Sequence, residues 1–255
     1  MTELENRLEK RLERISLSPT AAGRAEQLLN RSGARTLSDL HRLLAELPPG
    51  ARRQNACMLA GLVGDRRSTP RLLAAVLESA KKEEEAVAAA SALGSLGGAR
   101  VAATVRPLLR HPRPLVRTYA AYSLGFAGER TSAPLLAERL ADVSEDVQVR
   151  AHAAEALGHL CVRLPATARR AIVAGLRDPE PEVRFWSVFA ASFLPFTEVE
   201  ADLKRLRRDH SEIRGWWPVS TEARWALLRF AGKIDEAEAV LDEATTKAGT
   251  ATSGV

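Results

Sequence analysis

The chain has 255 residues, of which 45% are hydrophobic and 5% aromatic, with a formal net charge of +5. This apolar fraction is ordinary for a globular protein, and a composition rich in alanine and poor in aromatic residues favours packed helices over β-sheet. No apolar run approaches the 18 residues that a membrane span needs, and residues 1–17 are charged from the third position onward, unlike a secretory signal. We therefore expect a cytoplasmic protein that does not contact a membrane.

The N-terminal region predicts helices at about 3–15, 19–31 and 37–46. Ser18 and Pro19 form a start signal for the second helix, and Gly33 follows its end. We expect residues 1–36 to be capping helices and the third helix to open the first repeat.

A phrase recurs from residue 52 onward at a period of 31 to 34 residues. A period in this range indicates a stack of supersecondary units, each burying its apolar face against its neighbours. A small residue late in each copy needs close helix approach or a helix end to explain it, since glycine inside a helix costs about 1 kcal/mol relative to alanine. The copies are RRQNACMLAGLVGD (52–65), EAVAAASALGSLGG (85–98), PRPLVRTYAAYSLGFAG (112–128), EDVQVRAHAAEALGHLC (145–161) and PEPEVRFWSVFAASFL (179–194), with the small residues Gly61, Gly94, Gly125, Gly158 and Ser192.

Amphipathic segments alternate with these phrases, so each repeat is predicted to be an A helix followed by a phrase-bearing B helix. The A helices are expected at 68–80, 100–110, 132–141, 166–178 and 198–208, and the B helices at about 52–63, 84–97, 115–127, 148–160, 182–194 and 221–231. The predicted fold is all-α, a right-handed α-α superhelix of about six helix pairs over residues 37–244. Residues 245–255 are small and polar, and we expect a disordered tail there.

The phrase resembles the HEAT-repeat superfamily, in particular the short PBS-lyase HEAT-like repeats, over about residues 37–244. The matching residues include Asp178 and Arg184 and the core positions Val149, Arg150, Ala153, Ala154, Ala156, Leu157 and Gly158. The resemblance implies a solenoid but not one function, because such proteins include bilin-lyase subunits, adaptor scaffolds, DNA-alkylation glycosylases and repeat-built hydroxylases. The hydroxylases bind iron through His-Glu dipeptides, and this sequence has none.

An arginine column runs through the B helices, at Arg53, Arg117, Arg150 and Arg184. A row of arginines could bind phosphate. The resemblance instead implies a structural ladder in which each arginine pairs with an acid six residues before it, as Asp178 stands before Arg184. Because Arg117 and Arg150 lack an acid at that spacing, we expect them to be the free members.

A second set of columns lies two, five and nine residues after the arginine, on one helix face. In repeats three to five this face concentrates aromatic residues around two histidines and a carboxylate, and we expect it to face outward on a concave B-helix surface. The predicted partner-binding stripe is Tyr119, Tyr122, His152, Glu155, His159, Trp186 and Phe189, next to Phe126 and Phe193.

The stripe permits several interpretations. Its side chains could bind a peptide, an exposed helix or a flat ligand such as a tetrapyrrole, or three of them could hold a metal from one helix. Alternatively, the rings pack between helices and the histidines are only partly exposed. The sequence lacks a strong metal-ligand spacing, so we expect no metal and no cofactor. The thiols Cys57 and Cys161 lie three repeats apart and are expected to stay reduced.

Two further features could mediate binding. Residues 86–128 contain no acid, and a basic edge is expected from Arg106, Arg110, His111, Arg113 and Arg117, with Arg150 nearby. Such a patch suits an acidic protein, an anionic cofactor or nucleic acid. The adjacent Trp216 and Trp217 could be an interaction hot spot or a cover over the end of repeat five.

No nucleophile motif or phosphate-binding glycine loop is present, so the sequence favours a non-catalytic scaffold that binds a protein partner on its concave B-helix surface. A monomer is expected. The first alternative is a nucleic-acid-binding or DNA-alkylation-glycosylase-like protein that uses the basic edge. The second is a bilin-lyase-like protein that handles a chromophore.

Overall fold

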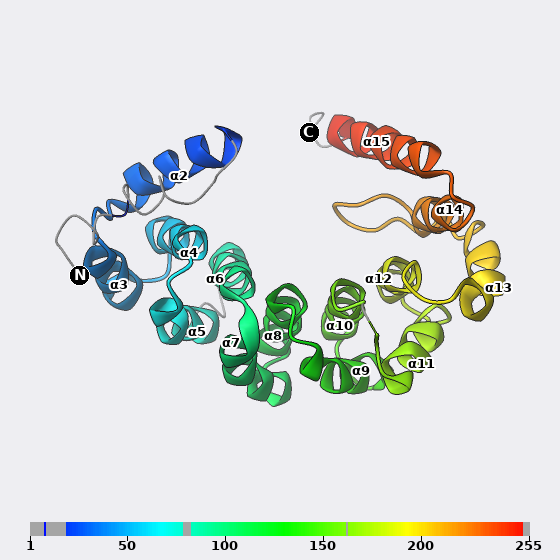
Figure 1. Ribbon diagram of the computed structural model, residues 1–255, viewed down its shortest axis with the longest axis horizontal. Helices are drawn as coiled ribbons and strands as arrows, with labels where there is room; N and C mark the ends of the chain where they lie inside the picture. Colours follow the sequence, from blue (N-terminus) through cyan, green and yellow to red (C-terminus); the bar gives the residue numbers. More distant parts are fainter. Residues whose placement is uncertain (1–7, 9–18, 79–82, 162, 252–255) are drawn as a thin grey trace. The chain divides into compact units, whose positions relative to one another are not determined.

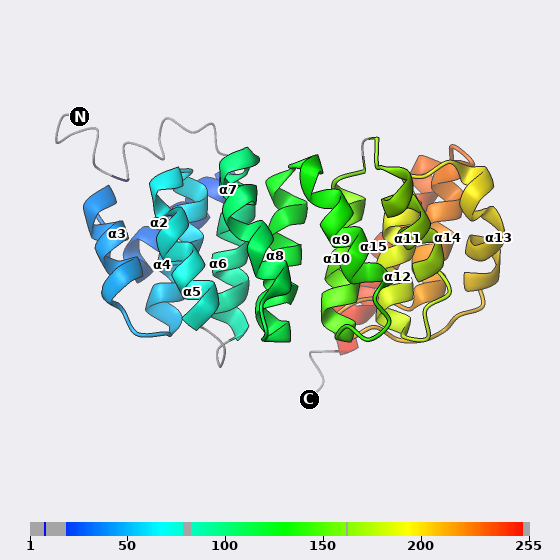
Figure 2. The ribbon, with the colours of Figure 1, turned by 90° about the horizontal axis from the view of Figure 1, so that it is seen from below.

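The chain is described here from a computed structural model that covers residues 8, 19–78, 83–161 and 163–251 (Figures 1 and 2). Within these ranges the regular elements are helices, which confirms the predicted all-α class. The helix expected at 3–15 lies outside them, except for Leu8. Contacts divide the chain into two compact units, Met1–Glu129 and Arg130–Val255.

The first unit consists of two layers of helices. The B helices α4, α6 and α8 pack on one another in one layer, while α3, α5 and α7 each pack on the B helix that follows (Figure 1). The elements are α2 (Pro19–Ser32), α3 (Leu37–Glu46), α4 (Ala51–Val63), η1 (Arg66–Ser68), α5 (Thr69–Glu78), α6 (Glu83–Leu96), α7 (Gly98–Val105), η2 (Arg106–Arg110) and α8 (Pro114–Ala127).

The second unit repeats this pattern. The B helices α10, α12 and α14 pack in sequence, α9 and α11 pack side by side behind them, and α15 covers α14 at the end of the unit. The elements are η3 (Arg130–Ser132), α9 (Ala133–Ala141), α10 (Val147–His159), α11 (Ala166–Gly175), α12 (Pro181–Ala191), α13 (Phe196–Leu206), α14 (Val219–Phe230) and α15 (Ile234–Ala251).

The glycines late in the B helices allow the next B helix to approach closely. A Cβ added to Gly94 would lie 2.6 Å from the Cβ of Phe126, and one added to Gly61 would lie 3.0 Å from the Cα of Ala92. A Cβ on Gly158 would lie 2.5 Å from Cε1 of Phe189. Real Cβ atoms essentially never come nearer than 3.0 Å, so close approach of the next B helix is the physical reason for glycine at positions 94 and 158 and leaves little space at position 61.

Local signals set the helix ends. Pro114 and Pro181 occupy the first turn of α8 and α12, where a missing N–H costs nothing. Thr36 and Asp39 form a capping box at the start of α3. Gly64 closes α4 in a left-handed conformation with φ of 70°.

The C-terminal region differs from the expected disordered tail at 245–255, because α15 continues to Ala251. The hydroxyls of Thr245 and Thr246 donate to the carbonyl oxygens of Leu241 and Asp242 at 2.8 and 2.9 Å, so these residues satisfy their polar groups within the helix. Residues 252–255 lie outside the described residues. Among the described helices, none has the length and apolar character needed to cross a bilayer.

Candidate functional site

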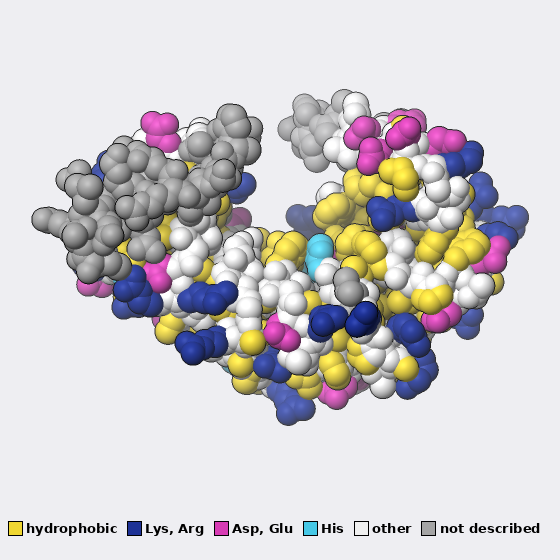
Figure 3. Space-filling model, in the orientation of Figure 1, with side chains coloured by type: hydrophobic (Ala, Val, Ile, Leu, Met, Phe, Trp, Pro, Cys, Tyr) yellow, Lys and Arg dark blue, Asp and Glu magenta, His cyan; other side chains and the backbone are white. Residues whose placement is uncertain are grey.

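Aromatic side chains gather on the B-helix layer of the second unit, and Figure 3 shows hydrophobic side chains over α12, α14 and the loop that joins α13 to α14. Their rings contact one another in an unbroken series. This group contains seven of the 12 aromatic residues of the chain, including all four tryptophans. We call it the aromatic cluster, and its members are Phe185, Trp186, Phe189, Phe193, Trp216, Trp217 and Trp225.

Edge-to-face packing fixes the rings of the cluster. The ring of Trp186 lies 5.1 Å from that of Trp216 at 79° and 5.2 Å from that of Phe185 at 89°. The ring of Phe189 lies 5.5 Å from that of Phe193 at 85° and stacks at 6.5 Å on that of Trp225. Because such pairs contribute about 0.5–1.5 kcal/mol each beyond burial, the cluster is a preorganised platform.

The platform has buried and exposed members. Phe185 and Trp225 are buried, whereas Trp216 is 45% and Phe193 is 37% exposed. The guanidinium carbon of Arg229 lies 5.7 Å from the ring centre of Phe193 and 4.9 Å from that of Trp225, a cation–π arrangement. Two exposed rings therefore stand on a packed base beside a cation.

The imidazoles and the carboxylate of the predicted stripe lie on α10. Nε2 of His159 is 3.8 Å from Oε1 of Glu155, and the His159 ring is 5.3 Å from that of Phe189. Nδ1 of His152 is 3.0 Å from the carbonyl oxygen of Gln148, which fits a proton on that nitrogen. Among the described residues, no group of three or more His, Cys, Asp or Glu side chains is placed to hold a metal ion.

The loop between α13 and α14 is held in place by hydrogen bonds. Nε1 of Trp217 donates to Oε2 of Glu222 at 2.7 Å, and the backbone N–H of Ser220 donates to the carbonyl oxygen of Asp209 at 2.7 Å. Burial raises the pKa of Glu222 to about 7, although the bond from Trp217 lowers it. Trp216 and Trp217 therefore cover α12, as one of the two sequence interpretations holds, and Trp216 also stays exposed.

Three positions of the predicted stripe, Tyr119, Glu155 and Trp186, are buried instead of facing outward, and Glu155 is 8% exposed. Trp186 is 9% exposed because the loop carrying Trp216 packs on it. Tyr119 is 4% exposed. It shares a helix face with Ser123, whose hydroxyl donates to the carbonyl oxygen of Ala90 in α6 at 3.0 Å, so this face of α8 packs against the preceding repeat.

The other aromatic positions of the first unit remain accessible. Tyr122 is half-buried, its ring lies 4.8 Å from that of Phe126, and Phe126 is 45% exposed. Together with Tyr119 these residues belong to the first unit, whereas the stripe residues on α10 and α12 belong to the second.

The residues of the expected basic edge also lie in both units, with Arg150 in the second and the others in the first. Arg106 donates from Nε to the carbonyl oxygen of Ala102 at 3.4 Å, and Nη1 of Arg117 donates to the carbonyl oxygens of His111 and Pro112 at 2.7 and 3.0 Å. Arg113 binds the carbonyl oxygen of Leu77. Arg110 and Arg113 are exposed at the turn between η2 and α8, while Arg150 lies in the second unit and is 4% exposed.

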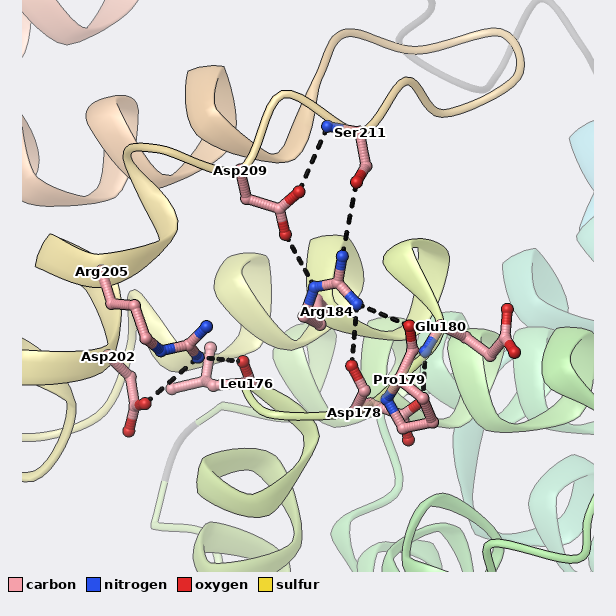
Figure 4. Close-up of polar contacts among 9 residues, drawn as sticks. All are labelled: Leu176, Asp178, Pro179, Glu180, Arg184, Asp202, Arg205, Asp209 and Ser211. Carbon is pink, nitrogen blue, oxygen red and sulfur yellow. Dashed lines mark hydrogen bonds and ion pairs between the residues drawn. The ribbon is translucent and has the colours of Figure 1, made fainter.

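Three arginines of the column, Arg53, Arg150 and Arg184, form a ladder of ion pairs with acids of the following repeat. Arg150, expected to be free, forms a buried ion pair with Asp178. Arg184 does not pair with the carboxylate of Asp178. It binds Oδ2 of Asp209 at 2.7 Å and donates to the backbone oxygen of Asp178 at 2.8 Å (Figure 4).

In the first unit Arg53 follows this pattern and pairs with Glu85 and Glu78 at 2.6 Å each, whereas the bonds of Arg117 to His111 and Pro112 are to backbone oxygens of its own repeat. The partner lies 32 residues after Arg53, 28 after Arg150 and 25 after Arg184, so turns of unequal length conceal the pairing in the sequence. In the sequence, the adjacent Trp216 and Trp217 indicate the aromatic cluster. No sequence pattern indicates that Trp225 and Arg229 belong beside it.

A family-model match in the middle of the chain agrees with this architecture. Residues 71–148 match the family model described as HEAT repeats. Human deoxyhypusine hydroxylase in complex with glycerol is 18% identical with a TM-score of 0.40, over 73% of this chain and 94% of that one. The complex of CpcE and CpcF of phycocyanin lyase from Nostoc sp. PCC7120 is 17% identical with a TM-score of 0.49, over 93% and 94%. The curated proteins give no match.

Proposed function

We propose that this chain, whose residues 71–148 match a family model of HEAT repeats, is a non-catalytic scaffold that binds a protein partner through the aromatic cluster of its B-helix layer. The observation that carries the proposal is the pair of exposed rings, Trp216 and Phe193, standing on buried aromatic residues. Stacked helical repeats mainly supply extended recognition surfaces.

The chemistry of the cluster supports protein recognition. Tryptophan and arginine are the residues most enriched among interface hot spots, and here Arg229 lies over the rings of Phe193 and Trp225. Rings that are already fixed lose little conformational entropy on binding. The expected contact region also includes His159 on α10, whose ring lies 5.3 Å from that of the cluster member Phe189 and which is paired with the buried Glu155.

The test is partner capture from the native organism by the purified, immobilised full chain. We expect Trp216→Ala and Phe193→Ser each to weaken the specific partner by about 30-fold, the effect of a 2 kcal/mol hot spot. Val143→Ala is the matched control, because Val143 is an exposed apolar side chain (83%) in the turn before α10. Tyr119 and Trp186 are left intact, since replacing buried rings would disturb packing.

Retention of all partners by both cluster variants, with their helix content unchanged, would overturn the proposal. Loss of the same partners by Val143→Ala would equally contradict the proposal, because the loss of binding would then not be specific to residues of the aromatic cluster.

The charge of the first unit favours nucleic-acid binding as a second candidate. This unit contains 20 Lys and Arg residues and 13 Asp and Glu residues, and 86–128 has no acid. Duplex DNA should bind more weakly as salt increases, with a slope that falls by about one on Arg110→Glu. The absence of binding at low salt would exclude this candidate.

A further inference from the structure

A depression of about 610 Å³ lies in the second unit at the turns that follow α11 and α13. It is distinct from the aromatic cluster and shares no residue with it. Four arginines and two aspartates line it: Arg177, Asp178, Arg184, Arg205, Arg208 and Asp209. We call it the arginine depression.

The two aspartates of the depression are neutralised by neighbouring arginines. Asp178 pairs with the buried Arg150, and Asp209 pairs with Nε of Arg184 at 2.7 Å. Burial raises the pKa of Asp209, but hydrogen bonds from Arg184 and Ser211 and the charge of Arg184 outweigh it, so the pKa lies below its ordinary value. Both carboxylates are thus already occupied as acceptors.

The exposed arginines carry more charge than their acid partner balances. Arg177 binds both carboxylate oxygens of Asp202 at 2.9 Å, and Nη2 of Arg205 binds the same carboxylate at 3.3 Å. Two guanidinium groups therefore share one acid. Arg208 is exposed, and no ion pair is found for it in the described part of the chain. About two positive charges remain uncompensated.

The shared carboxylate also positions these donors. Nη2 of Arg205 donates to the carbonyl oxygen of Leu176 at 2.7 Å, so Asp202 and the end of α11 hold its guanidinium in place (Figure 4). Nη1 of Arg177 and of Arg205 takes no part in these bonds. Donors that are fixed before binding cost less entropy to engage.

We propose that the arginine depression binds a phosphate monoester group. Such a group carries about −1.5 to −2 charges and several acceptor oxygens, which matches the uncompensated charge of Arg177, Arg205 and Arg208. Arginine forks fit phosphate geometry better than lysine does. The second unit as a whole contains 17 Lys and Arg residues and 19 Asp and Glu residues, which favours a compact anion over an extended polyanion.

The proposal is tested on the full chain by titration with inorganic phosphate and with O-phosphoserine at low salt, followed by the Nε–H signals of arginine in NMR spectra. Saturable shifts are expected, and Arg208→Glu should weaken binding at least tenfold. Arg224→Glu is the matched control, because Arg224 is an exposed arginine on α14 outside the depression, and it should change affinity less than twofold.

A second arm distinguishes the source of the group. A phosphoserine peptide that binds more tightly than O-phosphoserine, with no binding of the unphosphorylated peptide, assigns the site to phosphorylated protein, and equal affinities assign it to small phosphorylated molecules. Either result supports the proposal. Lack of saturable binding, equal losses in both variants, or tighter binding of duplex DNA that depends on Arg208 overturns it.

Discussion

Among single residues, Glu222 shows how the fold changes the chemistry of a side chain. It is 3% exposed, its carboxylate accepts the indole N–H of Trp217, and burial raises its pKa to about 7 from an ordinary 4.5. Between these values the folded chain binds more protons than the unfolded chain. The free energy of unfolding therefore falls as pH rises from about 4.5 to 7, and this group adds no further change above 7.

Glu222→Gln should remove this pH dependence, because the amide oxygen still accepts the bond from Trp217 and does not ionise. At pH 8 we expect the variant to be more stable than the parent by up to about 3 kcal/mol, the equivalent of the pKa shift, and at pH 5 to differ little. Urea unfolding followed by tryptophan fluorescence measures this difference.

Glu238→Gln on the exposed face of α15 serves as the control and should leave the pH profile unchanged. If the stability of Glu222→Gln changed with pH in parallel with that of the parent, the folded chain would ionise Glu222 without a loss of stability.

At the level of the helices, stability depends on how near neighbouring B helices can come. Gly94 faces the Cβ of Phe126, and a Cβ cannot rotate away as the end of a side chain can. Gly23 in α2 has no atom within 4 Å of an added Cβ. Replacing glycine by alanine should therefore lower the free energy of unfolding at position 94 and raise it at position 23.

Gly94→Ala should destabilise the first unit by about 1–3 kcal/mol, since overpacking outweighs the gain in helix propensity. Gly23→Ala should stabilise it by about 0.5–1 kcal/mol. Far-UV circular dichroism during thermal unfolding is the appropriate measurement, because the first unit contains no tryptophan. Stabilisation by Gly94→Ala would contradict this prediction, because it would show that α6 and α8 can move apart without a loss of stability.

The helices were largely predictable from the sequence, whereas the contacts of the candidate site were not. Pro114 and Pro181 and the recurring small residues reveal where B helices begin and where they approach one another. The pairing of Arg150 with Asp178 depends on the path of an intervening turn, which local pattern does not specify. Trp186 is buried by a loop for the same reason.

For the molecule as a whole, the tryptophans provide a probe of one unit. All four lie between residues 186 and 225, so their fluorescence reports on the second unit, while circular dichroism reports on both. In repeat stacks, stability is approximately a sum of repeat and nearest-neighbour contributions. A substitution that destabilises only the second unit should therefore lower the unfolding midpoint measured by fluorescence more than the midpoint measured by circular dichroism.

Arg150→Ala should lower stability by about 3 kcal/mol, because it removes the ion-pair partner of Asp178, whose side chain is 7% exposed and keeps only the hydrogen bond from the backbone N–H of Glu180. The fluorescence midpoint should fall more than the dichroism midpoint. Arg177→Ala, at a side chain 67% exposed, should cost less than about 1 kcal/mol by either method. Coincident curves for Arg150→Ala would indicate that the whole chain unfolds in one cooperative step.

Asp209 has a double role whose consequence is thermodynamic. Its carboxylate holds Arg184 at the arginine depression, and its carbonyl oxygen accepts the N–H of Ser220, closing the loop that bears Trp216. An anion that draws Arg184 away from Asp209 would remove one of the contacts that hold the residue at which the loop begins. Linkage is reciprocal, so any factor by which such an anion changes affinity at Trp216 is also the factor by which a partner there changes affinity for the anion.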